Sequence, residues 1–124
     1  MENVQAVIVP HAGYVFSGVT AASAFAAINP DAEYEHIFLL GPSHHVYLGK
    51  ASVNIGASAY ATPLGNVPVD TALCKDLMEK SDAITYAQEA HGSEHCLEVE
   101  LPFLQYHMKK IPSIVPIIIA TQEL

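Results

Sequence analysis

The sequence predicts an α/β fold in which helices flank a mostly parallel sheet, and three observations favour it. Apolar runs of strand length occupy residues 4–9, 35–40 and 114–120, and helical apolar patterns lie between them. Strands of parallel sheets are apolar without interruption because helices cover both faces of the sheet. The composition agrees, since 51% of the residues are hydrophobic and only 15% are charged. A chain of 124 residues suits one hydrophobic core, so we expect a single domain over residues 1–124.

The first half of the chain alternates between strand and helix patterns. Residues 4–9 form the first expected strand, and an alanine-rich helix follows at about residues 18–28. That helix ends before Pro30, because proline cannot continue a helix. The second expected strand, at residues 35–40, leads into a long loop that begins with Gly41 and Pro42.

The second half carries turn and helix-capping signals. A weak alternation at residues 51–55 indicates a further strand, and Thr62-Pro63-Leu64-Gly65 has the composition of a turn. Asp70 is the expected N-cap of a helix at residues 71–80.

A second helix in this half is expected to begin near Ser93 and to run toward Lys110. Leucines and a methionine form an apolar stripe along it at helical spacing. Pro102 either kinks this helix or restarts it. The last strand spans residues 114–120.

Charge and cysteine content exclude several classes of function. The net charge is −8 with only five lysines and arginines, so we expect binding to neither nucleic acid nor membrane surfaces. No apolar run reaches the length of a membrane span. Cys74 and Cys96 match no metal or redox spacing, which favours a reduced, cytoplasmic protein.

Two histidines follow predicted strands directly and are the main candidates for a functional site. His11 comes after residues 4–9, and His44 comes after residues 35–40. If these strands are parallel neighbours, both imidazoles emerge at the carboxyl edge of the sheet, where open α/β sheets bind ligands. We therefore predict a metal or proton-transfer site there. The alternative is a pair of loop histidines that only bond to backbone carbonyls.

Four further residues are candidates to line the same cleft. Only one of His44 and His45 is expected to face the site, since adjacent side chains point in different directions. Tyr14 follows His11 at the start of the first helix, where backbone amides can hold an anion. Glu94 and His95 are expected in the first turn of the later helix, where carboxylates suit the positive end of the helix dipole.

The segment His91-Gly92-Ser93-Glu94-His95 also matches a zinc-peptidase pattern. Such a site needs both histidines on one continuous helix, and Gly92 and Ser93 disfavour one there. Cys96 could lie near the cleft, whereas Cys74 is expected to pack in the core.

Several sequence blocks together resemble the Memo-like family, whose prokaryotic members are called AmmeMemoRadiSam system protein B. They are Pro10-His11-Ala12-Gly13-Tyr14, Gly41-Pro42-Ser43-His44-His45, Thr62-Pro63-Leu64-Gly65 and the run from Glu94 to Gln105. The resemblance implies a fold like that of class III extradiol dioxygenases. It also implies that the chain corresponds to the N-terminal half of one Memo-like domain, truncated at the C-terminus.

The resemblance implies that His11 and His44 are metal ligands, with Fe(II) or Cu preferred to Zn. The family's third ligand is a downstream cysteine, which neither Cys74 nor Cys96 matches. The function implied is a metal-binding protein, with a metal-dependent oxidoreductase as one form of it and no enzyme activity fixed. The alternative is a non-catalytic module that binds a peptide, a small molecule or an anion in the same cleft. Radical-SAM and AMMECR1-like proteins are the partners that the resemblance implies.

Overall fold

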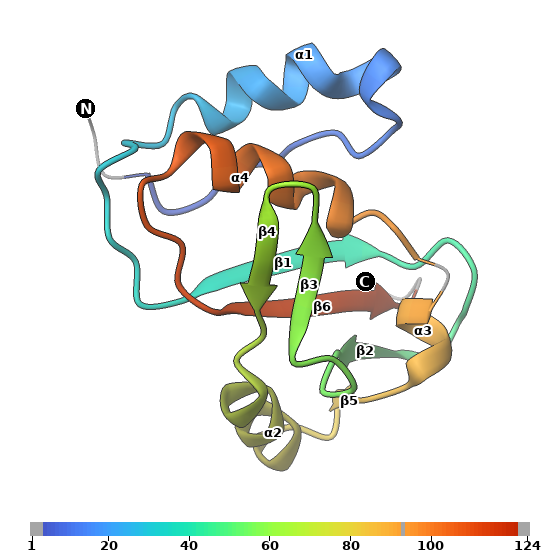
Figure 1. Cartoon of the computed structure of the whole chain (residues 1–124). Helices are drawn as coiled ribbons and strands as arrows, with labels where there is room; N and C mark the ends of the chain where they lie inside the picture. The colour runs from blue at the N-terminus through green and yellow to red at the C-terminus, as the bar shows by residue number, and fades with distance from the viewer. Residues whose placement is uncertain (1–3, 93, 122–124) are drawn as a thin grey trace.

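A computed structural model describes residues 4–92 and 94–121 and shows an α/β fold (Figure 1). Its main sheet has the strand order β1-β6-β2-β5. Strand β1 (Ile37–Pro42) is parallel to β6 (Ile114–Ala120), and β2 (Lys50–Val53) is parallel to β5 (Ile84–Thr85). Only the junction of β2 with β6 is antiparallel within this sheet. The prediction of a mostly parallel sheet flanked by helices is therefore confirmed.

Strand β6 forms the centre of the core. Ile114, Val115 and Ile118 are almost completely buried, as an uninterrupted apolar strand predicts. Helix α4 (Leu101–His107) contributes Leu101 and Leu104 to the core that contains β6.

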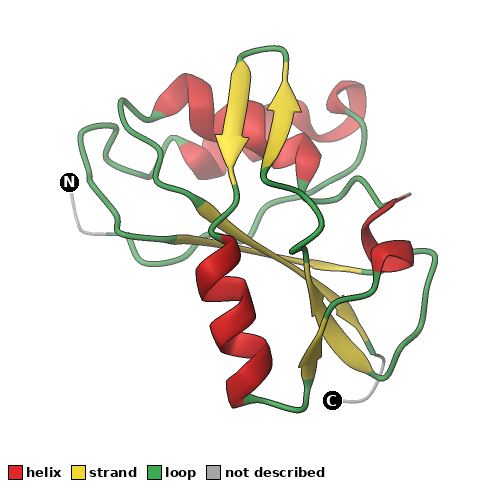
Figure 2. Cartoon of the chain, turned by 60° about the horizontal axis from the view of Figure 1, so that its bottom comes forward, coloured by secondary structure: helices red, strands yellow, loops and turns green. Residues whose placement is uncertain are grey.

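Helix α1 (Tyr14–Phe25) packs on α4 away from the sheet, as Figure 1 shows. The rings of Phe25 and Phe103 stack there with centroids 5.4 Å apart. Figure 2 shows these two helices together on one side of the molecule, with α2 (Thr71–Lys80) on the other. No helix in the described ranges is long and apolar enough to cross a membrane.

The turn and capping signals of the second half are confirmed. The segment Thr62-Pro63-Leu64-Gly65 joins β3 (Ala59–Thr62) to β4 (Gly65–Pro68) in an antiparallel hairpin. Gly65 adopts a φ of +119°, a conformation that side-chain-bearing residues rarely accept. Asp70 caps α2, since its side chain accepts a hydrogen bond from the Leu73 N–H at 3.0 Å.

The prediction of a strand at residues 4–9 is wrong. This segment pairs with no strand in the described part of the chain. Val4, Val7 and Val9 are partly buried against the core, so the apolar pattern correctly predicts the burial of these side chains. A strand also needs a neighbour that exchanges backbone hydrogen bonds with it, and side-chain hydrophobicity does not encode that neighbour.

Helix α1 begins and ends earlier than the expected residues 18–28. The N–H groups of Phe16 and Ser17 already donate to the Gly13 carbonyl, which starts the helix directly after the turn at His11. The helix ends at Phe25, before the Asn29-Pro30 signal. In addition, Gly41 and Pro42 belong to β1 and not to a loop.

The helix expected from Ser93 toward Lys110 forms only in part, and the alternative that Pro102 restarts it is confirmed. The chain forms α3 (Gln88–Gly92), a turn, a 3₁₀ helix η1 (Glu98–Glu100) and then α4. Pro102 lies in the first turn of α4, so it restarts the helix where its missing N–H costs least. Glu94 and His95 lie in the turn before η1 and not in a first helical turn, and the expected cap Ser93 lies outside the described residues.

Candidate metal centre

The structure brings His11 and His44 together. Their Nε2 atoms are 3.2 Å apart, and their ring centroids are separated by 5.0 Å. His44 follows the end of β1, and His11 follows the unpaired segment 4–9, which ends at the same edge of the sheet. The two residues meet even though the segments that carry them do not pair. About half of the His44 side chain remains accessible to solvent, so a ligand can reach this pair.

The Glu94 carboxylate fixes the other side of the His44 ring. Its oxygens lie 2.9 and 3.0 Å from His44 Nδ1, and they also accept the backbone N–H of His44 at 2.6 Å. The backbone N–H groups of His95 and Cys96 donate to the same carboxylate at 3.1 and 3.3 Å. Burial opposes ionisation of Glu94, but these hydrogen bonds outweigh it and lower its pKa to about 2.

This arrangement sets the tautomer of His44. An ionised carboxylate only accepts hydrogen bonds, so Nδ1 of His44 carries the proton. The Nε2 atom of a neutral ring then holds a lone pair, and this atom lies within hydrogen-bond distance of His11 Nε2. In this orientation Nε2 is the ring nitrogen of His44 that could bind a metal.

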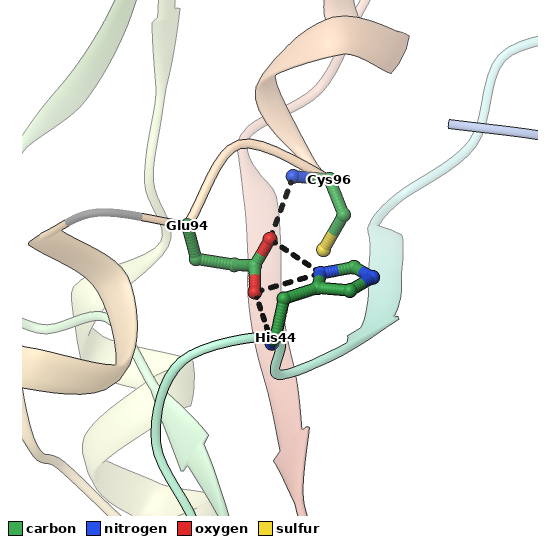
Figure 3. A group of neighbouring side chains, drawn as sticks. All are labelled: His44, Glu94 and Cys96. Carbon is green, nitrogen blue, oxygen red and sulfur yellow. Dashed lines mark hydrogen bonds and ion pairs between the residues drawn. The ribbon is translucent and has the colours of Figure 1, made fainter. Parts of the chain in front are cut away.

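Cys96 joins His44 and Glu94 in a second possible ligand group, in which the three side chains point toward one another (Figure 3). One ligand atom from each residue lies within 4.8 Å of the others. Burial, followed by the Glu94 charge, raises the pKa of the Cys96 thiol to about 12. The thiol donates to the Pro42 carbonyl at 3.4 Å. The sequence indicated that Cys96 could lie near the cleft, because it follows His95 directly, but it assigned this thiol no role as a ligand.

The remaining cleft candidates lie around this centre without joining it. The Tyr14 hydroxyl donates to the Val99 carbonyl at 3.0 Å, and burial raises its pKa. Of the histidine doublet, the His44 side chain makes the recorded contacts with His11 and Glu94, whereas His45 is exposed and no such contact is recorded for its side chain. His95 is also exposed, and its Nδ1 lies 3.2 Å from a Glu98 carboxylate oxygen.

The zinc-peptidase pattern does not form its site. His91 lies near the end of α3, where its Nε2 is 2.9 Å from the buried Ser52 hydroxyl. His95 lies beyond the end of that helix. The two histidines therefore do not share the continuous helix that such a site requires.

Comparison of the sequence with known proteins identifies a family. The Memo-like protein family matches residues 1–124. The chain belongs to the Memo-like family. MEMO1 family proteins of Metallosphaera sedula and Thermococcus onnurineus are 38% and 39% identical to it over 115 and 124 residues. The relative from Methanopyrus kandleri is 37% identical over 118 residues.

These Memo-like relatives are longer than the chain. The matched residues cover 93%, 98% and 95% of the chain but only 40%, 42% and 41% of the three relatives. The chain thus spans about two fifths of the length of these relatives.

Proposed function

We propose that this Memo-like chain binds a redox-active metal ion, Fe(II) or Cu, through Nε2 of His11 and Nε2 of His44. The separation of these two atoms carries the proposal. Two nitrogens that each lie about 2.1 Å from one metal are about 3.0–3.4 Å apart for ligand angles between about 90° and 109°. The observed separation is 3.2 Å. The separation of the two nitrogens therefore fits a shared metal, which would replace the contact between the rings.

The Glu94 carboxylate supports the same assignment. Metal-binding histidines generally donate their second ring N–H to a carboxylate or carbonyl, which fixes the ring and makes it a better ligand. His44 has this contact through Nδ1. Bound iron or copper would supply one-electron redox chemistry at the coordination positions that two imidazoles leave open.

The second possible group, His44 with Glu94 and Cys96, is the less favourable arrangement. A metal there would have to displace the proton of the buried Cys96 thiol, which donates to the Pro42 carbonyl. It would also replace the hydrogen bonds that Glu94 makes with His44. We therefore assign the metal to the face shared with His11.

Metal loading of single variants tests this function. The chain is reconstituted anaerobically with Fe(II), or with Cu, desalted and assayed by elemental analysis. We expect near-stoichiometric metal in the parent chain and its loss in His11→Ala and His44→Ala. His45→Ala is the matched control and should keep the metal, because His45 lies outside the site.

Cys96→Ser decides between the two ligand groups. It should retain the metal if His11 and His44 are the ligands. Loss of metal in Cys96→Ser together with full retention in His11→Ala would assign the metal to the His44, Glu94 and Cys96 group. Unchanged metal content in both His11→Ala and His44→Ala would refute metal binding at this edge of the sheet.

Oxidoreductase activity, and the alternative of a module that binds peptides or anions, stay predictions. The same holds for a cytoplasmic location and for partnership with radical-SAM and AMMECR1-like proteins.

A further inference from the structure

Strand β1 has an unused edge. It is the terminal strand of the order β1-β6-β2-β5, and the Ser43 N–H donates to the Ile119 carbonyl of β6 at 3.1 Å. Backbone groups alternate in direction along a strand. The backbone N–H and C=O groups of Phe38 and Leu40 therefore point away from β6. None of the described residues forms a backbone hydrogen bond with them.

The position of Pro42 agrees with an edge of β1 that pairs with no other strand. Proline has no N–H, and in sheets it is confined to places where that donor would face no neighbouring strand. The carbonyl of Pro42 points to the same side as the groups of Phe38 and Leu40, and it accepts the Cys96 thiol. The edge thus leaves the donors and acceptors of Phe38 and Leu40 for a partner.

Residues 4–9 form the opposite wall of a slot beside this edge. Both walls run toward the same end, because His11 and His44 meet there. In the described chain, the only recorded hydrogen bond to the backbone of residues 4–9 is from the Tyr34 hydroxyl to the Val4 carbonyl, at 2.8 Å. All six residues of this segment and all six of β1 line one cavity of about 630 Å³.

The slot is apolar, and its walls leave large apolar side chains exposed. Ile8 is 97% exposed, Leu40 63% and Phe38 48%. The cavity lining contains no lysine, arginine or aspartate, and Glu100 is its one carboxylate. A charged side chain entering this space would lose its hydration without gaining a partner of opposite charge at the walls.

We propose that this slot receives one extended, uncharged strand of polypeptide, which pairs with the free edge of β1. Repeating N–H and carbonyl groups along an edge match a peptide backbone, and an added strand gains affinity from these main-chain bonds. The strand would cover the exposed apolar side chains of both walls. The relatives carry polypeptide beyond the matched region, since the chain spans only 40–42% of the three described above, so such a strand is available within the family.

Binding of a designed peptide tests the proposal on the whole chain. The probe is a short fluorescent peptide with valine and threonine at its centre and a lysine at each end for solubility. Its control has the same sequence with alternate backbone nitrogens methylated on the edge that would face β1. We expect saturable binding of the probe by fluorescence anisotropy. Binding should be at least about tenfold weaker for the methylated peptide, since methylation removes the N–H donors that would pair with β1.

Two variants at one position separate backbone pairing from side-chain contact. Leu40→Pro removes an N–H on the free edge and spares the side that faces β6, so it should weaken binding about as much as methylation does. Leu40→Ala keeps the N–H and should bind within about threefold of the parent chain. Circular dichroism and a thermal melt report whether Leu40→Pro folds, and the methylated peptide provides the test if it does not.

Three results would overturn the proposal. The first is no detectable binding of the probe. The second is equal binding of the methylated and unmethylated peptides, which would show apolar capture without strand pairing. The third is a dimer by light scattering that becomes monomeric in Leu40→Pro, which would show that a second copy of the chain fills the slot.

Discussion

The imidazole of His44 and the carboxylate of Glu94 lie 2.9 Å apart, although 50 positions separate them in the chain. The turn between α3 and η1 carries Glu94 to the carboxyl end of β1, where its side chain is 5% exposed. A buried carboxylate in this place holds the His44 ring and leaves Nε2 facing His11. The orientation of the candidate metal ligand therefore depends on a residue that the sequence places in a different element.

Replacing Glu94 with glutamine should weaken metal binding. The amide keeps the shape of the side chain but loses the charge that strengthens the contact with His44 Nδ1. Loss of such a partner typically reduces metal affinity about 10–100-fold. Competition with a chelator of known affinity measures the change. Glu98→Gln is the control, because that exposed carboxylate contacts His95 outside the site, and an equal loss in both variants would contradict a specific role for Glu94.

Gly41→Ala should destabilise the protein by about 1–3 kcal/mol, because it overpacks the contact between β1 and the turn that carries Cys96. A Cβ atom at Gly41 would lie 2.5 Å from Cys96 Sγ and 3.0 Å from Leu97 Cδ2. Urea unfolding measures the loss. Gly92→Ala is the control, since a Cβ there meets nothing within 4 Å.

A double-mutant cycle tests the cause of that loss. Cys96→Ala removes the sulfur atom and should restore part of the stability of Gly41→Ala. Strictly additive effects of the two substitutions would show that the clash with Cys96 is not the reason.

Asp70→Ala should cost about 1 kcal/mol, since an N-cap that is replaced by alanine leaves a helix donor without its partner. The lost bond is the one from the Leu73 N–H to the Asp70 carboxylate. Chemical denaturation with a circular dichroism readout measures the change. Asp76→Ala serves as the comparison, because its pair with Lys80 is exposed and contributes little to stability. Equal effects of the two substitutions would argue against the cap.

Stability should fall as the pH rises from about 4.5 to 7, because of Glu100. Both of its carboxylate oxygens are buried and find no hydrogen-bond partner among the described residues. Burial raises its pKa from 4.5 to about 7, so within this range the folded chain keeps a proton that the unfolded chain releases. The resulting loss in the free energy of unfolding is complete above about pH 7 and amounts to at most roughly 3 kcal/mol.

Glu100→Gln isolates this contribution. Urea unfolding at pH 5 and pH 8 should show that the parent chain loses stability relative to the variant as the pH rises. A constant difference between the two proteins at both pH values would contradict a buried, protonated carboxyl.

The sequence by itself determined the fold class, the central strands and the helix after Asp70. These features depend on local information: an uninterrupted apolar run for β6, a capping carboxylate for α2, and Pro63 and Gly65 for the hairpin turn. The sequence also indicated His11 and His44, because a histidine directly after a buried run emerges at an edge of the fold. For this part of the molecule, composition and local spacing were sufficient.

Only the tertiary structure decided which groups meet. The apolar pattern of residues 4–9 could not show that these residues line a slot without forming a strand, because strand pairing depends on a distant neighbour. Glu94 and Cys96 reach His44 because a turn replaces the expected helix there. Hydrogen bonds and metal sites bring together atoms from residues that are far apart in the chain. Residue type and local spacing do not specify which of these residues meet.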